Sequence, residues 1–152
     1  SPGSNIASQA YTINYNGLNV ISTGNVGIGT AAPVTNAILA IKDGHFQSQQ
    51  TTAPAIATGA ASTAVALTNA TDVAGNISIT TNTTAGIGAT ITFNKAYTVA
   101  PRVIITSTNA FSCAEIAKVY VTTPTTSTFT ITFNAAPLAN TKTYGYYVIE
   151  TQ

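Results

Sequence analysis

The chain has 152 residues, only 6% of them charged, and its formal net charge at pH 7 is +1. It has no cluster of Lys and Arg that would neutralise a row of phosphates, so its charge argues against nucleic-acid binding. No stretch approaches the roughly 18 consecutive apolar residues of a membrane-spanning helix, and we predict no membrane insertion. The length fits one ordinary domain with a short extended lead-in.

The composition predicts an all-β fold. Thr, Ala, Asn, Ile and Val dominate almost every stretch, and Met and Trp are absent. These residues favour strands and turns, whereas an amphipathic helix needs runs of Leu, Glu, Lys and Arg. Protein surfaces usually carry about 25–35% charged residues. We therefore expect a homo-oligomer that covers apolar faces which a monomer would leave in water.

The first part of the chain predicts short strands separated by turns. We expect residues 1–9 to be a disordered lead that contains the remnant of a cloning tag. Residues 10–59 are predicted to form a neck or shaft segment and a linker. The last part of this range, from His45 to Gly59, is the predicted linker or an edge segment. Strands this short cannot bury a core alone, so we expect three chains to wrap together in an intertwined neck. The expected strands are Tyr11–Tyr15 and Leu18–Ile21, joined by an Asn16-Gly17 hairpin turn, then Val26–Thr30 and Ala37–Ile41.

Residues 60–152 are predicted to form a separate head domain. All charged residues except Lys42 and Asp43 lie beyond position 70, as expected for a more exposed globular part. Seven short strands separated by turns favour a β-sandwich with a jelly-roll-like arrangement. We expect these strands at residues 62–68, 73–81, 88–94, 102–108, 114–122, 127–134 and 142–150.

A five-residue pattern occurs twice in the head. Thr90-Ile-Thr-Phe-Asn94 recurs as Thr130-Ile-Thr-Phe-Asn134. Because side chains alternate along a strand, Ile and Phe share one face and the two Thr share the other. Each copy is predicted to be a half-buried strand that ends at an Asn turn, and similar strand chemistry explains the echo better than duplication.

One stretch resembles a segment that recurs in tail-fibre and spike proteins of phages and other viruses, and in some bacterial surface proteins. It is Gly24-Asn-Val-Gly-Ile-Gly-Thr30, followed by Pro33 and by Ile38-Leu-Ala-Ile41. Ala31-Ala32 stands where a Thr, Ser or Asn pair is typical. The resemblance covers about 18 residues and implies a trimeric fibre, just before its distal domain.

The head resembles fibre-tip domains and the H-type lectin pattern. The similar stretches are Thr90–Tyr97, Ala100-Pro-Arg-Val-Ile-Ile-Thr106, Phe129-Thr-Ile-Thr132 and Tyr144-Gly-Tyr-Tyr147. This resemblance implies a small trimeric β-sandwich that binds sugars. The late Trp of the lectin pattern is missing, with Tyr146 and Tyr147 near its place, so no sugar-contacting residue is carried over.

The candidate binding residues lie in the last strand and in one loop. Alternation places Lys142, Tyr144, Tyr146, Val148 and Glu150 on one face of the last strand, and Tyr147 and Ile149 on the other. The face with both charges is predicted to be exposed, so Tyr144 and Tyr146 are expected to be surface aromatics. We expect them to pack against a neighbouring subunit, and stacking on a sugar ring is the second alternative. Asn109, Phe111 and Ser112 lie in a loop between strands and are candidates for a binding tip.

Catalytic and metal-binding groups are few. No two of the acids Asp43, Asp72, Glu115 and Glu150 belong to one local motif, so we predict no enzyme and no cofactor. Cys113, the single cysteine, is predicted to be a buried thiol. His45 is the single histidine, which rules out a multi-histidine site within one chain. Three copies of His45 around a trimer axis remain an alternative, with an ordinary neck histidine preferred.

These observations predict the distal domain of a trimeric virus or phage fibre, placed at the virion surface or outside the cell. Its partners are predicted to be two further copies of the chain and a host-surface receptor, with a glycan as the expected receptor. A capsid-decoration or fibre-assembly domain without receptor binding is the alternative. A fibre-borne glycan-degrading enzyme ranks third, because such enzymes generally need a pair of carboxylates.

Overall fold

The computed structural model describes residues 26–28, 39–41, 45, 47–122 and 124–150. The chain divides into two compact units, Ser1–Phe46 and Gln47–Gln152. In the first unit, β1 (Val26–Ile28) pairs in parallel with β2 (Leu39–Ile41). The expected lead at 1–9 and the expected hairpin at Asn16-Gly17 lie outside the described residues, and the intertwined neck stays a prediction.

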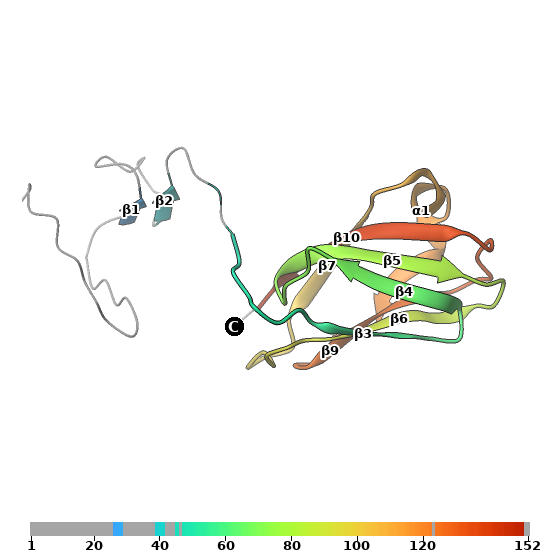
Figure 1. Cartoon of the computed structure of the whole chain (residues 1–152), viewed down its shortest axis with the longest axis horizontal. Helices are drawn as coiled ribbons and strands as arrows, with labels where there is room; N and C mark the ends of the chain where they lie inside the picture. Colours follow the sequence, from blue (N-terminus) through green and yellow to red (C-terminus); the bar gives the residue numbers. More distant parts are fainter. Residues whose placement is uncertain (1–25, 29–38, 42–44, 46, 123, 151–152) are drawn as a thin grey trace, which may run out of the picture. The chain divides into compact units, whose positions relative to one another are not determined.

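The second unit, which we call the head, is a sandwich of two four-stranded antiparallel sheets (Figure 1). The first sheet has the strand order β4-β5-β10-β7 and the second has the order β3-β6-β9-β8. The connections β4–β5 and β8–β9 stay within one sheet, whereas the other connections between consecutive head strands pass from one sheet to the other. The all-β prediction is confirmed. The strands are β3 (Ala55–Thr58), β4 (Ser62–Thr68), β5 (Ala74–Thr81), β6 (Gly86–Thr92), β7 (Arg102–Ser107), β8 (Val119–Thr122), β9 (Thr128–Phe133) and β10 (Thr141–Ile149).

Of the two alternatives predicted for His45–Gly59, a linker or an edge segment, the structure has the second, because β3 is an edge strand of the second sheet. Another segment of the head differs from the sequence-based expectation. The strand expected over 114–122 begins only at Val119, because α1 (Ala110–Ala114) and the 3-10 helix η1 (Ile116–Lys118) come before it. A five-residue helix is too short to produce an apolar stripe in the sequence, so the composition gave no sign of it.

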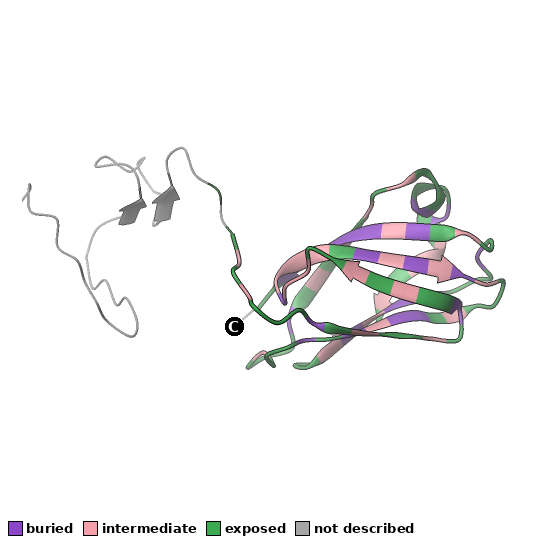
Figure 2. Cartoon of the chain, in the orientation of Figure 1, coloured by how far each residue is buried: buried purple, intermediate pink, exposed green. Residues whose placement is uncertain are grey.

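The core follows from the alternation of side chains along the strands (Figure 2). The repeated pattern behaves as predicted: Ile91, Phe93, Ile131 and Phe133 are buried. Its two copies also lie side by side, because β6 and β9 pair with Thr90 opposite Thr130. The sheets meet through aromatic contacts such as Phe129 with Tyr146, whose ring centroids are 5.6 Å apart. The buried apolar residues are Ala61, Ile77, Ile79, Ala89, Ile91, Phe93, Phe129, Ile131, Phe133, Tyr144, Tyr146 and Val148.

Candidate functional site

Loops gather at two ends of the head, because its paired strands run antiparallel (Figure 1). The segment 47–54 leads into β3 at one end of the head, which we call the near end, and we call the opposite end the far end. Hydrogen bonds join neighbouring loops at the far end: the Asn82 amide donates to the Ala61 carbonyl (3.1 Å), and the Asn134 amide donates to the Lys118 carbonyl (2.9 Å). The near end holds the incoming segment 47–54, the loops 69–73, 93–101 and 124–127, and the end of β10; the far end holds the loops 59–61, 82–85, 108–118 and 134–140.

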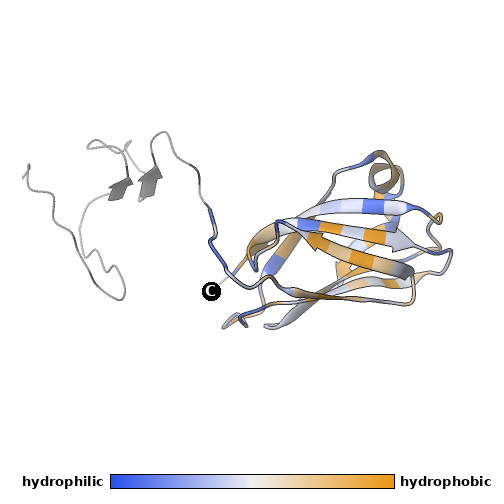
Figure 3. Cartoon of the chain, viewed as in Figure 1, coloured by the Kyte–Doolittle hydropathy of each residue, from blue (hydrophilic) through white to orange (hydrophobic). Residues whose placement is uncertain are grey.

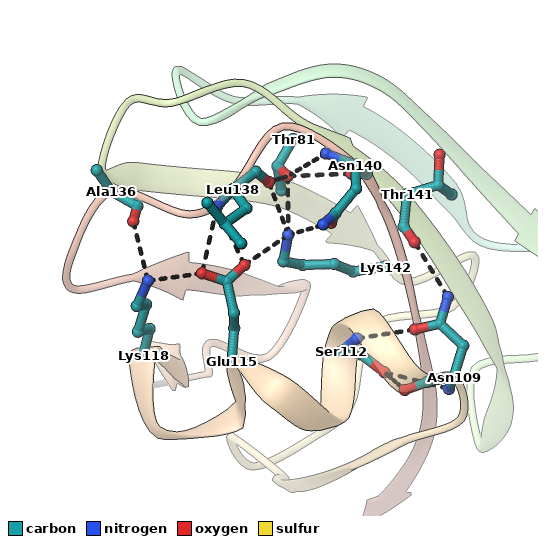
Figure 4. A network of polar contacts seen from close by, with 10 residues as sticks. All are labelled: Thr81, Asn109, Ser112, Glu115, Lys118, Ala136, Leu138, Asn140, Thr141 and Lys142. Atoms are coloured by element: carbon teal, nitrogen blue, oxygen red, sulfur yellow. Dashed lines mark hydrogen bonds and ion pairs between the residues drawn. The ribbon is translucent and has the colours of Figure 1, made fainter.

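A buried lysine anchors the far end (Figure 4). Lys142, the second residue of β10, is 0% exposed, and its Nζ lies 2.8 Å from Oε2 of Glu115, which is 5% exposed. The ammonium also donates to Thr81 Oγ1 (3.0 Å), Leu138 O (2.9 Å) and Asn140 Oδ1 (2.5 Å). Burying a charge is costly unless it is paired and hydrogen-bonded, and here both conditions are met.

Glu115 connects this lysine to the loops around it. Its Oε1 accepts from Lys118 Nζ at 2.6 Å, and its two oxygens accept from the Leu138 amide at 3.2 and 3.1 Å. Desolvation by burial pushes the pKa of Glu115 upward, but the hydrogen bonds from Lys118, Lys142 and Leu138 and the charge of Lys142 outweigh it and lower the pKa to about 2. The carboxylate is thus ionised at neutral pH and fixes the 108–118 and 134–140 loops to β10.

Asn109 and Ser112 build the loop that carries α1. The Ser112 amide donates to Asn109 Oδ1 (2.8 Å) and the Asn109 amide donates to Ser112 Oγ (3.2 Å), which together form a capping box. Ser112 is 0% exposed. Of the three residues predicted for a binding tip, these two hold the loop, and Phe111 alone offers a large exposed side chain, at 54%.

Two further apolar side chains are exposed at the far end. Ile116 in η1 is 42% exposed, and Leu138 in the 134–140 loop is 64% exposed. Neither residue was among the predicted binding residues, although the place of Leu138 in a turn segment between Asn134 and Asn140 was a visible signal. Phe111, Ile116 and Leu138, which we call the far-end apolar residues, stand on loops that the Glu115 network holds in place.

The predicted exposure of Tyr144 and Tyr146 is wrong. Tyr144 is 0% exposed and Tyr146 is 1% exposed, while Tyr147 on the opposite face is 61% exposed. The reason is Lys142, whose charge is paired inside the head and therefore does not mark the solvent-facing side of β10. Desolvation by burial raises the pKa of both buried tyrosines, with a further contribution to Tyr144 from the charge of Glu115.

The hydroxyl groups of the two buried tyrosines differ in their bonding. The Tyr146 hydroxyl donates to the Thr71 carbonyl at 2.5 Å. The Tyr144 hydroxyl has no hydrogen-bond partner among the described residues. Both side chains serve the core, so neither is available to a ligand.

The candidate metal and thiol groups do not form a site in the part of the chain that the structure describes. There, no group of three or more His, Cys, Asp and Glu side chains lies close enough to hold a metal ion. His45 is exposed and precedes the head. The prediction of a buried Cys113 is wrong, because this thiol lies on the exposed side of α1.

Two acids that are far apart in the sequence line the same pocket at the near end. Asp72 and Glu150 border a hollow of about 300 Å³ together with Lys95 and Tyr97. The Asp72 carboxylate accepts from the amides of Asn94 (2.7 Å) and Lys95 (2.9 Å). Glu150 Oε1 accepts from the amides of Thr98 (2.7 Å) and Val99 (3.0 Å). Both carboxylates thus bind the backbone of the 93–101 loop.

Comparison of the chain with protein families, with curated protein sequences and with solved structures finds no match. In the described ranges, no helix is long and apolar enough to cross a membrane.

Proposed function

We propose that the chain is the distal part of a trimeric virus or phage fibre, and that its head attaches to a glycan on the host surface. The proposal places the protein at the virion surface or outside the cell. The observation that carries it is the set of far-end apolar residues, exposed by 54%, 42% and 64%, on loops fixed by a buried ion pair. The resemblance of residues 24–41 to fibre segments supports the trimer.

The far end suits the recognition of a neutral sugar surface. It lies opposite the end at which the chain enters the head, which is where an attachment domain meets its target. Phe111 offers an exposed ring for stacking. Since Lys142 and Glu115 are buried and paired, the charge at this end that remains partly exposed belongs to Lys118, at 38%. Rigid loops lose less conformational entropy on binding, which favours affinity.

A glycan array tests the attachment function. We expect the wild-type chain to bind a defined set of glycans, and Phe111→Ala to weaken that binding at least about ten-fold, as expected for an aromatic hot spot. Tyr120→Ala is the matched control, because Tyr120 is 48% exposed on β8 and lies outside the far-end loops. Absence of any glycan signal above background contradicts the attachment function.

Size-exclusion chromatography with light scattering tests the trimer. We expect a mass three times that of the chain at micromolar concentration. A well-folded monomer under these conditions contradicts the trimeric fibre, whatever the glycan array shows.

A structural role without receptor binding is the second candidate. The observation that favours it is the exposure of Ile104 and Ile149, at 56% and 55%, beside Tyr147 on the outer face of the first sheet. Such a face suits capsid decoration or fibre assembly. A trimer that binds no glycan supports this role.

A glycan-degrading enzyme is the third candidate. Asp72 and Glu150 line one pocket, but each already accepts two hydrogen bonds from loop amides. A fall in the viscosity of a polysaccharide solution, abolished by Glu150→Gln, is the result that would favour this activity over attachment.

A further inference from the structure

A primary amine, a carboxylate and a carboxamide meet inside the far end of the head (Figure 4). The Lys142 Nζ lies 2.8 Å from Glu115 Oε2 and 2.5 Å from Asn140 Oδ1. A C=O bond is about 1.23 Å long, so the carboxamide carbon of Asn140 lies no further than about 3.7 Å from Nζ. This is close to the separation of about 3–3.5 Å at which two groups are positioned to react. The site therefore holds a nucleophilic atom beside an amide carbon.

Four oxygen atoms surround the lysine nitrogen. Besides Glu115 and Asn140, the Thr81 Oγ1 lies at 3.0 Å and the Leu138 carbonyl oxygen at 2.9 Å. An ammonium has three N–H donors, so the four oxygens share them. Thr81 ends β5 and Leu138 lies in the 134–140 loop, so two separate segments of the chain fix the nitrogen in place beside Asn140.

Burial changes the balance between the charged and the neutral forms of this pair. Lys142 is 0% exposed and Glu115 is 5% exposed. Figure 3 shows the strands of the head mostly in white and orange, with isolated blue residues, so an ion pair is an exception inside this sandwich. Each buried charge is costly, so moving a proton from Nζ to Oε2, which removes both charges, costs less here than in water. The lowered pKa of Glu115 keeps the ion pair as the main form, and the free amine is a minor form.

We infer that Lys142 and Asn140 join in an isopeptide bond, with Glu115 as the proton carrier. Glu115 takes a proton from the Lys142 ammonium, and the free amine attacks the Asn140 carboxamide carbon, whose C=O π bond opens. Glu115 gives its proton to the amide nitrogen, the bond from carbon to that nitrogen breaks and the C=O bond re-forms. Glu115 then removes the extra proton from Nζ and passes it to the departing ammonia. The net reaction turns an ammonium and a carboxamide into a secondary amide and a free ammonium ion, without oxidation or reduction.

The reaction occurs once in each chain, and the ion pair is its starting state. Because the free amine is a minor form, we expect slow conversion, so that the freshly folded chain still holds the ion pair. The ring closed between positions 140 and 142 is small, and it therefore stabilises the head little through chain entropy. Its effect is to replace a buried ammonium by a neutral amide and to tie the 134–140 loop covalently to β10.

Intact-mass spectrometry and trypsin digestion of the full chain test this bond. We expect the chain to become lighter, over days, by the mass of one ammonia molecule. Trypsin cleaves after Lys118 and Lys142 in the fresh chain, once it is denatured, and gives the peptides 119–142 and 143–152. In the converted chain Lys142 is uncharged and is no longer cleaved, so residues 119–152 are released as one peptide.

Four variants separate the roles of the residues. Lys142→Met should keep its mass, and Glu115→Gln should react at least about a hundred-fold more slowly, because a positioned proton carrier contributes about 10²–10⁴ to a rate. Asn140→Asp should lose water instead of ammonia and reach the same final mass as the wild type. Lys118→Met is the matched control, because it removes a cation bound to the same carboxylate and should convert as the wild type does.

Ring closure of Asn140 onto its own backbone also releases ammonia, but that product leaves Lys142 cleavable by trypsin and forms in Lys142→Met as well. A constant wild-type mass, or a loss of ammonia that persists in Lys142→Met, overturns the isopeptide bond. The trypsin digest of the wild type decides the question without a variant, so a variant that fails to fold does not hide the answer. An unchanged rate in Glu115→Gln overturns the role of Glu115. This inference goes beyond the proposed function, and neither the glycan array nor the trimer mass depends on its outcome.

Discussion

The buried ion pair between Glu115 and Lys142 sets how firmly the far end of the head is held. Glu115→Gln keeps the shape of the side chain and removes its charge, leaving Lys142, 0% exposed, without a carboxylate. Removing one partner of a buried pair costs about 3–5 kcal/mol. Lys142 still has three hydrogen-bond acceptors, so we expect the lower end of that range, about 3 kcal/mol, in the free energy of unfolding.

Lys118 provides a matched control for this substitution. It binds the same carboxylate at 2.6 Å, but it is 38% exposed. Exposed ion pairs contribute about 0–1 kcal/mol, so we expect Lys118→Met to cost no more than that. The double variant Glu115→Gln with Lys142→Met should cost less than the two single changes added together, because the second change removes a charge that the first leaves unpaired.

The pH dependence gives an independent check on the same pair. The pKa of Glu115 in the folded state is about 2, against an ordinary value of 4.5. A carboxyl whose pKa is lowered on folding stabilises the protein above its unfolded pKa, and this stabilisation is lost as the pH falls toward the folded pKa. We therefore expect the contribution of Glu115, at most about 3 kcal/mol, to be complete at pH 7 and to disappear between about pH 4.5 and pH 2.

Guanidinium unfolding followed by circular dichroism measures these effects. The difference between the wild type and Glu115→Gln should be largest at pH 7 and shrink steadily below about pH 4.5, where the wild type begins to lose the contribution. A difference that stays constant down to pH 2.5, or a cost for Lys118→Met as large as that for Glu115→Gln, would refute this account of the far end.

Three further predictions concern stability and use the same unfolding assay. Tyr144→Phe should be neutral or should stabilise the head by up to about 1 kcal/mol, because the buried Tyr144 hydroxyl lacks a partner among the described residues. Tyr146→Phe should cost about 1 kcal/mol, because it removes a hydrogen bond to the Thr71 carbonyl. Equal effects of the two substitutions would contradict this prediction. Gly88→Ala should cost at least about 2 kcal/mol, because its Cβ would lie 2.5 Å from the Phe133 ring, and a neutral result would mean that the ring moves freely. Asn109→Ala should cost about 1 kcal/mol through loss of the helix cap. Asn109→Asp should rescue only part of this cost, because it keeps the cap acceptor but loses the hydrogen bond that Asn109 Nδ2 donates to the Thr141 carbonyl (3.0 Å). A silent Asn109→Ala would show that the cap contributes nothing.

Much of the head was predictable because its strands follow local rules. Six of the expected strands, including 62–68 and 102–108, lie within two residues of those observed. Their β-branched and aromatic residues alternate with Thr, and this period of two reports a half-buried strand wherever it occurs. α1 was not predictable in this way, because a helix of five residues depends on its Asn109–Ser112 cap rather than on a periodic pattern.

The candidate site was less predictable than the strands. Phe111 was selected as a tip residue and is exposed, but Asn109 and Ser112 belong to the cap. Tyr144 and Tyr146 were assigned to the surface because Lys142 shares their face, and charged residues are rarely buried. Nothing in the local sequence around Lys142 indicates its partner Glu115. Glu115 precedes it by 27 positions and reaches it through the packing of α1 against β10.

The sequence by itself determined the all-β class, the spacing of the strands in the head and the absence of charge from most of its surface, since these depend on composition and on side-chain alternation. Only the tertiary structure decided which face of β10 meets solvent. Alternation divides a strand into two faces but does not orient them, and here a long-range ion pair turned Lys142, Tyr144 and Tyr146 inward. The same choice left Tyr147 exposed on the outer face of the first sheet.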